Sequence, residues 1–573
     1  MSTITTEATD TPVTANPTTA PDQREHASAI QQLVEGETAW DKRLIAWSDW
    51  INPILVKETR QALKSRQFSW TLMLLTIVIL AWSVLAIVGM IPSIYYNSSG
   101  AGMLIGYAII LIVPALIVIP QSTFRSMASE LEDGTFETLS LSTLSPRHIL
   151  VGKLSVAALQ LIVYLSVIAP CIALTYLLRG ITLEVIAMTI SIIASCSLAL
   201  SAIAISVASF SRTRMQQVFF SIILLAGQVF CAIWTGAILV GLVSTGGYGL
   251  ERWIAFGVFL LAVILYGWLL LRCGACAIGF SSDNRSTPIR IPLLVIGLLM
   301  CMIEGFMIVA YGNDSSAGSG MNFMQEMVAV AVTSLFVHWG VAGSILMGER
   351  GTIPARARRS LPSSLLGRVF LTWLNPGAGP GYIFVLLSFM GSAFTLALAP
   401  LVLLPPGQRN IQLPLIIYIS AVTCYLALYL GIVRLSCMVF LRKVLIGRLI
   451  ISFALTLVMI VMSVIVTCSL SLAANDYQTL TFGWYCFPNF FWTLTELFPD
   501  RSSSWSNSEE VFAFIVLVLC ALTVAFVNIL FTAKDVVLLR IETPERVKEE
   551  RNRRRAKHGH DNAEVDDPDP IFG

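Results

Sequence analysis

The sequence predicts an all-α polytopic membrane protein with about twelve transmembrane helices. Hydrophobic residues make up 56% of its 573 residues and charged residues only 13%, whereas soluble domains are about 45–50% apolar and about 25% charged. Twelve apolar stretches are each long enough to cross the hydrocarbon core of a bilayer, which takes about 20 residues. The net charge of +2 gives no reason to expect a nucleic-acid partner.

The chain begins with a polar tail, residues 1–50, rich in Thr, Ala, Pro and Glu, which we expect to be disordered and cytosolic. From residue 51 the pattern becomes amphipathic. Asn52 is a suitable helix cap and Pro53 suits the first helical position. Apolar side chains fall on one side of the predicted helix, and the other side carries basic residues that include Lys57, Arg60 and Lys64. This pattern favours an interfacial helix on the inner leaflet; the alternative is a plain basic flank of the first span.

The predicted spans fall into two sets of six. The first set is 70–91, 101–120, 150–178, 182–210, 217–243 and 253–272; the second is 291–312, 325–347, 381–404, 411–433, 449–473 and 511–532. With both termini in the cytosol, 33 of the 37 Lys and Arg residues fall on the cytosolic side. Basic residues collect on that side of membrane proteins, so the sequence predicts an even number of spans with both tails inside.

The segment 128–153 is a polar stretch between the second and third spans. Its acidic residues are Glu130, Glu132, Asp133 and Glu137, and the first, third and fourth of these recur at helical spacing around a bend at a glycine. A Ser-Pro pair then restarts a helix that enters apolar sequence. We expect a soluble partner to bind this segment.

This pattern resembles the cytosolic loop between the second and third spans of permeases of the ABC type-2 exporter family. The matching positions are the acidic stretch from Glu130 to Asp133, then Gly134-Thr135, Leu139, Ser145-Pro146 and Gly152-Lys153. The resemblance covers residues 52–272. It implies that Glu130, Glu132, Asp133, Gly134, Thr135, Glu137, Leu139, Pro146 and Lys153 couple the chain to a separate ATPase subunit. It also implies that the interfacial helix is an elbow helix before the first span.

Residues 273–532 form a second six-span domain, and residues 533–573 a charged cytosolic tail. Glu349-Arg-Gly351-Thr352 repeats the order of Glu132-Asp-Gly134-Thr135, which would fit a divergent repeat, but arginines follow it where the first loop is acidic. Those arginines suit anionic lipid headgroups. The aromatic segment 474–510 resembles the re-entrant helices of type-2 exporters; an ordinary aromatic belt at the membrane interface is the alternative.

Two ionisable residues lie within predicted spans, Glu304 and His338. Such residues are costly in a membrane and mark functional sites, so a proton relay in which they are partners is one interpretation; a buried hydrogen-bonded pair is the other. The only Cys-x-x-Cys, at 273–276, has no second pair, and we predict no metal site and no catalytic residue. No Gly-x4-Gly-Lys-Ser/Thr loop is present, so ATP would be used by a partner and no cofactor bound by this chain.

The resulting hypothesis is a permease subunit of an ABC exporter in the inner (plasma) membrane. One copy of the chain or a homodimer would work with the separate ATPase subunit. Two alternatives remain open. One is a non-transporting anchor or assembly protein with a permease-like fold, and the other is an intramembrane lipid-modifying enzyme. The sequence does not name the substrate.

Overall fold

The computed structural model describes residues 53–91, 96–132, 145–211, 213–244, 249–279, 284–311, 320–349, 372–403, 413–440, 448–474, 482–497, 508–537, 546 and 549–550. Within these residues the chain forms helices and no strand. Twelve of the helical segments are long and apolar enough to cross a membrane. The predicted all-α, multi-pass fold is therefore confirmed.

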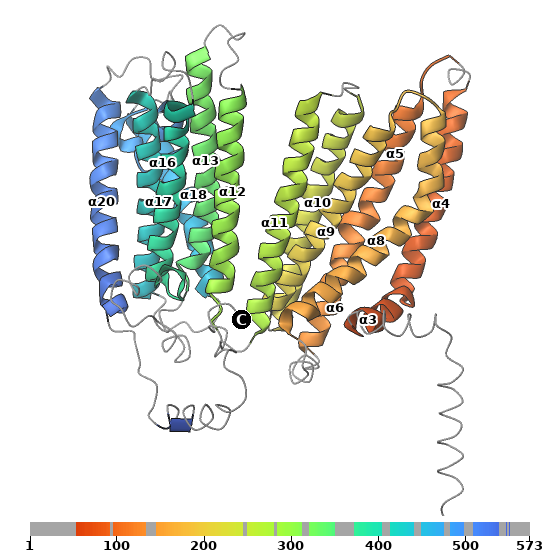
Figure 1. The fold of residues 1–573 in the computed structure, drawn as a ribbon, viewed down its shortest axis with the longest axis horizontal. Coiled ribbons are helices and arrows are strands. Elements are labelled where there is room, and N and C mark those ends of the chain that lie inside the picture. Colours follow the sequence, from red (N-terminus) through yellow and green to blue (C-terminus); the bar gives the residue numbers. More distant parts are fainter. Residues whose placement is uncertain are drawn as a thin grey trace, which may run out of the picture.

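The first half of the chain begins with a short helix, α3 (Pro53–Leu63), that lies across one end of the bundle (Figure 1). We call this end of the molecule the α3 end. The following helices are α4 (Arg66–Met90), α5 (Gly100–Ile112), η2 (Val113–Val118), α6 (Ile119–Glu132), α8 (Pro146–Leu177), α9 (Leu183–Phe210), α10 (Arg214–Ser244) and α11 (Leu250–Ile278).

The second half forms a second bundle beside the first, and α11 packs against α12 where they meet (Figure 1). Its elements are α12 (Thr287–Tyr311), α13 (Gly320–Leu346), η3 (Thr372–Leu374), α16 (Ala378–Leu403), α17 (Leu413–Phe440), α18 (Arg448–Ala474), η5 (Trp484–Cys486), α19 (Phe490–Glu496) and α20 (Ser508–Val537). The described residues form three hydrophobic clusters. Two lie in the first half, one from Phe68 to Val243 and a smaller one from Phe124 to Ile278; the third runs from Leu269 of α11 into the second bundle, to Ala521.

The second span differs from its prediction. Instead of ending at residue 120, the helix continues as α6 to Glu132, through a wider π-helical turn at η2. Prolines explain the wide turn, because Pro114 and Pro120 have no N–H to donate to the ordinary ladder. The carbonyl of Ala115 instead accepts a hydrogen bond from Ser197 Oγ of α9 at 2.6 Å. A neighbouring helix thus satisfies a polar backbone group that lipid could not.

Candidate functional site

The segment 128–153 is only partly described. Asp133, Gly134, Thr135, Glu137 and Leu139 lie outside the described residues. Glu130 and Glu132 belong to the last turn of α6, so they sit on a helix and not in a loop. Pro146 is the first residue of α8, after Ser145, whose Oγ accepts a hydrogen bond from the backbone N–H of His148. The two ends of the segment are therefore fixed by helices.

Lys153 is the centre of a buried polar cluster at the α3 end. Its Nζ lies 2.5 Å from Glu58 Oε1 of α3 and 3.0 Å from Glu130 Oε1 of α6. It also donates to Ser126 Oγ of α6 at 2.9 Å. Only 1% of the Lys153 side chain is exposed. We call Glu58, Ser126, Glu130 and Lys153 the Lys153 cluster; it joins α3, α6 and α8 at one point.

The charges of the Lys153 cluster depend on one another. Burial raises the pKa of Glu58 above its ordinary value, and the ammonium of Lys153 opposes that shift. Removing a charge from water is expensive unless an opposite charge and hydrogen bonds compensate. Lys153 supplies that compensation to Glu58 and Glu130 together. Because Lys153 is buried, it offers no surface to a soluble partner; its contacts connect its own helix, α8, to α3 and α6.

Glu132 is placed differently from Glu130. About half of its side chain is exposed, and its carboxylate lies 3.9 Å from Arg214, which is more exposed still. A pair of this kind contributes little to stability. Glu132 is therefore accessible to a soluble partner at the α3 end. Beyond it, Lys57 and Arg60 of α3 and Lys64, just after α3, are also exposed, as the interfacial-helix interpretation requires.

The second half has its own buried ion pair at the same end. The guanidinium of Arg290, at the start of α12, is fully buried and lies 2.5 Å from Glu349 Oε2, just after α13. It also donates to the carbonyl oxygens of Trp373 and Gly377, the latter at 3.0 Å. The N–H of Gly377 donates to the same Glu349 oxygen at 3.1 Å. Arg290 thus ties the first span of this half to the chain that enters α16.

Each half has a buried ion pair at the α3 end, but the two pairs are built differently. In each, a carboxylate at the end of the second span, Glu130 or Glu349, pairs with a buried cation at the α3 end. The cation comes from the third span in the first half and from the first span in the second half. Glu349 corresponds in the suggested repeat to Glu132, which makes only an exposed pair with Arg214, so the divergent repeat stays a prediction.

Glu304 and His338 have different partners in the structure. Glu304 Oε1 accepts a hydrogen bond from Ser334 of α13. His338 Nε2 is 3.3 Å from the carbonyl oxygen of Leu293, and its Nδ1 is 2.9 Å from the hydroxyl of Tyr266 on α11. A carbonyl only accepts, so Nε2 carries the proton and Nδ1 accepts from Tyr266. His338 therefore connects the two bundles, and its partners are Tyr266 and Leu293 instead of Glu304.

The aromatic segment after α18 enters the second bundle from the end opposite α3. The carbonyl oxygens of Phe487 and Pro488 accept hydrogen bonds at 2.6 Å from Tyr425 and Tyr429 of α17. Asn489 donates to Thr467 of α18 at 3.1 Å, seven residues from the end of that helix, which is a depth of about 10 Å. The segment is therefore inserted among the helices, as the re-entrant interpretation expects.

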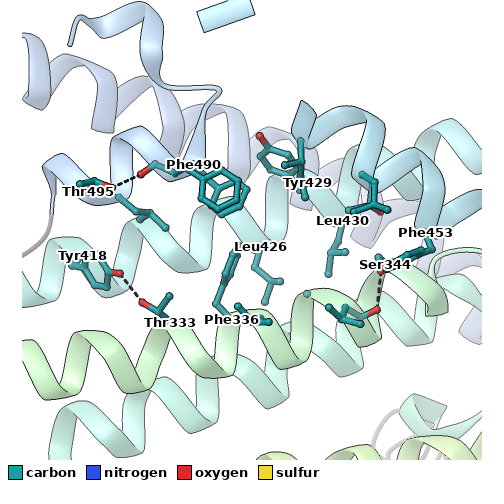
Figure 2. Close-up of a pocket in the computed structure, with 18 residues that line it drawn as sticks. Thr333, Phe336, Ser344, Tyr418, Leu426, Tyr429, Leu430, Phe453, Phe490 and Thr495 are labelled. Atoms are coloured by element: carbon teal, nitrogen blue, oxygen red, sulfur yellow. Dashed lines mark hydrogen bonds between the residues drawn. The ribbon is translucent and has the colours of Figure 1, made fainter. Parts of the chain in front are cut away.

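Beneath this inserted segment lies a cavity of about 510 Å³ between α13, α17, α18 and α19 (Figure 2). Its walls are mostly aliphatic and aromatic. Thr333 and Tyr418 are joined by a 2.7 Å hydrogen bond on one side, and Phe490 lies near Tyr429 on another. No sequence pattern predicts this cavity, since its walls come from four separate helices.

Sequence reasoning also missed Glu58 and Arg290. Glu58 lies among the basic residues of α3, and Arg290 is one of the basic residues on the predicted cytosolic side. A lone acid or base at a helix end is not a distinctive motif. Among the described residues, no group of three His, Cys, Asp or Glu side chains is arranged to hold a metal ion. No protein-family model, curated protein or solved structure matches this chain.

Proposed function

We propose that this chain is the membrane subunit of an ABC exporter and that a separate ATPase subunit docks at the α3 end, on the segment 128–153. The α3 end then faces the cytosol, with both termini, in the inner (plasma) membrane. The single observation that carries the proposal is the Lys153 cluster. It connects α3 and both helices that flank the docking segment through one buried cation.

The cluster supplies a physical route for coupling. A push on the segment moves the end of α6 and the start of α8, and the buried ion pairs make these ends move with α3 as one unit. Separating them would leave a charge unpaired in an apolar environment, which costs about 3–5 kcal/mol. Motion at the docking surface is therefore carried into the spans instead of being absorbed by loose loop ends. ATP binds to the partner in this scheme, and this chain holds no cofactor.

The test is affinity purification of the full chain in mild detergent, followed by identification of any ATP-binding subunit that comes with it. The informative variant is Glu132→Lys, because Glu132 is exposed and its loss disturbs only a weak pair with Arg214. Like charges placed against each other at an interface cost several kcal/mol. We expect the variant to fold normally and to lose the ATPase subunit.

The matched control is Glu184→Lys, the same charge reversal on an exposed acid in the first turn of α9, at the opposite end of the molecule. Its recovery of the subunit should equal that of the natural chain. Equal recovery of the ATPase subunit with Glu132→Lys would support the transporter class but show that the docking site lies elsewhere. Failure to recover any ATPase from membranes that preserve such complexes would favour a non-transporting anchor.

A further inference from the structure

The cavity between α13, α17, α18 and α19 has the size of a small-molecule site. Its volume of about 510 Å³ falls within the range of about 300–1,000 Å³ of protein ligand pockets. It lies inside the second bundle alone. Nothing in the exporter proposal uses it, so its occupant must be inferred from its walls and its opening.

The walls of the cavity carry no charged side chain, and their polar groups are already satisfied. Six lining residues bear hydroxyls, and each is hydrogen-bonded within the protein: Thr333, Ser344, Tyr418, Tyr429, Thr456 and Thr495. A buried water needs about 2–4 polar partners, and a polar ligand needs groups that are free to bond. The uncharged walls, whose hydroxyl hydrogens are already used within the protein, therefore favour an apolar occupant.

The cavity opens sideways, toward the surrounding bilayer. Four of its lining residues are about half exposed: Val337 and Val341 of α13, Leu457 of α18 and Phe491 of α19. Val341 is five residues and Leu457 nine residues from the ends of their helices at the α3 end. At 1.5 Å per residue these are depths of about 8 and 14 Å, within one leaflet of a hydrocarbon core about 30 Å thick.

We propose that the cavity holds one acyl chain of a membrane lipid from the leaflet at the α3 end. The chain enters past Val337 and Val341 and continues toward α19, whose Phe490 and Thr495 line the cavity (Figure 2). Hydrocarbon replaces an empty apolar space, and the lipid headgroup stays at the membrane surface. This inference does not depend on the exporter proposal.

The experiment places the full chain in phospholipid vesicles that contain a phospholipid with a photoreactive diazirine at the end of one acyl chain. After irradiation, cross-linked residues are mapped by peptide mass spectrometry. Bulk lipid labels exposed side chains over the whole bundle. Only an inserted chain reaches Leu426 and Leu494, which line the cavity and are buried from the surface. We expect cross-links at these two residues.

The blocking variant is Gly340→Trp. A Cβ at Gly340 would meet only Leu426, at 3.9 Å, so the new side chain projects into the cavity without a backbone clash. The control is Gly391→Trp on α16, an exposed glycine with nothing within 4 Å of its added Cβ. We expect the labelling of Leu426 and Leu494 to be lost with Gly340→Trp and kept with Gly391→Trp.

Labelling confined to exposed residues would overturn the proposal, and so would labelling of the cavity that persists in Gly340→Trp. If that variant does not fold, Val341→Trp blocks the half-exposed mouth of the cavity instead and must give the same loss. The assay contains no ATPase. A negative result here combined with recovery of the ATPase subunit would leave the exporter proposal intact.

Discussion

Lys153→Met tests whether the Lys153 cluster holds α3 to the bundle. The substitution keeps the length of the side chain but removes the cation that lies 2.5 Å from Glu58 and 3.0 Å from Glu130. Two carboxylates then face each other without a counter-charge. Breaking a buried ion pair by removing one partner costs about 3–5 kcal/mol. At about 1.4 kcal/mol per tenfold change, the fraction of molecules with α3 detached should rise by at least about a hundredfold.

Limited digestion with trypsin measures this detachment. Trypsin cleaves after basic residues, and α3 offers Lys57 and Arg60 in one short helix. A protease must unfold a helix locally to cut it, so the rate of cleavage follows the population of the detached state. We expect Lys153→Met to be cut in α3 much faster than the natural chain. The cut sites are identified by mass spectrometry.

Lys57→Met is the control, since it removes an exposed lysine from the same helix. It should leave cleavage after Arg60 unchanged. The double variant Glu58→Gln with Lys153→Met removes the buried charge on α3 and should recover part of the lost protection. Equal cleavage rates in Lys153→Met and the natural chain would refute the argument that the buried pair fastens α3.

The same cluster predicts a dependence on pH. The pKa of Glu58 in the folded chain is raised above 4.5, so the folded state holds this proton more tightly than the unfolded state does. Stability is therefore gained as the pH falls through the raised pKa toward 4.5. In Lys153→Met the ammonium no longer opposes the shift, and the gain should begin at a higher pH. Melting temperatures measured from pH 7 to 5 check this; identical pH profiles for the two proteins would contradict it.

Three further substitutions test other parts of the structure. Arg290→Lys keeps the charge but not the planar guanidinium that reaches Glu349 and two carbonyl oxygens together. The melting temperature should fall by an amount equivalent to about 1–3 kcal/mol, the cost of a buried carbonyl left without its donor. Tyr429→Phe leaves the buried carbonyl of the inserted segment without its donor, at about 1–3 kcal/mol, and Cys486 should react faster with maleimide. Gly106→Ala places a Cβ 2.1 Å from a tryptophan ring and should destabilise the chain by about 1–3 kcal/mol.

Each of these changes has a control on the same type of residue. Arg214→Lys changes an arginine that is 85% exposed, Tyr176→Phe a half-exposed tyrosine on α8, and Gly227→Ala a helical glycine with open space around it. Surface substitutions of this kind stay within about 0.5 kcal/mol. A control that melts as low as its partner variant would show that the effect does not come from the contact named.

The sequence by itself determined the twelve spans and their grouping into two sets. Crossing a bilayer needs only a local property, a run of about 20 apolar residues, and that property can be read one segment at a time. The second span is longer than its sequence prediction. It runs on to Glu132 through a wide turn at two prolines, and Ser197, far away in the chain, donates to a backbone carbonyl that the helix's own hydrogen bonds leave open.

Tertiary structure alone decided which polar residues meet. Glu58 and Lys153 are 95 residues apart, and Arg290 and Glu349 are 59 apart; no local pattern pairs them, since the packing of whole helices sets their distance. For the same reason Glu304 and His338 do not pair with each other: Glu304 pairs with Ser334, and His338 with Tyr266 and Leu293. The cavity is the clearest case, because an empty volume belongs to four helices together and to no residue in particular.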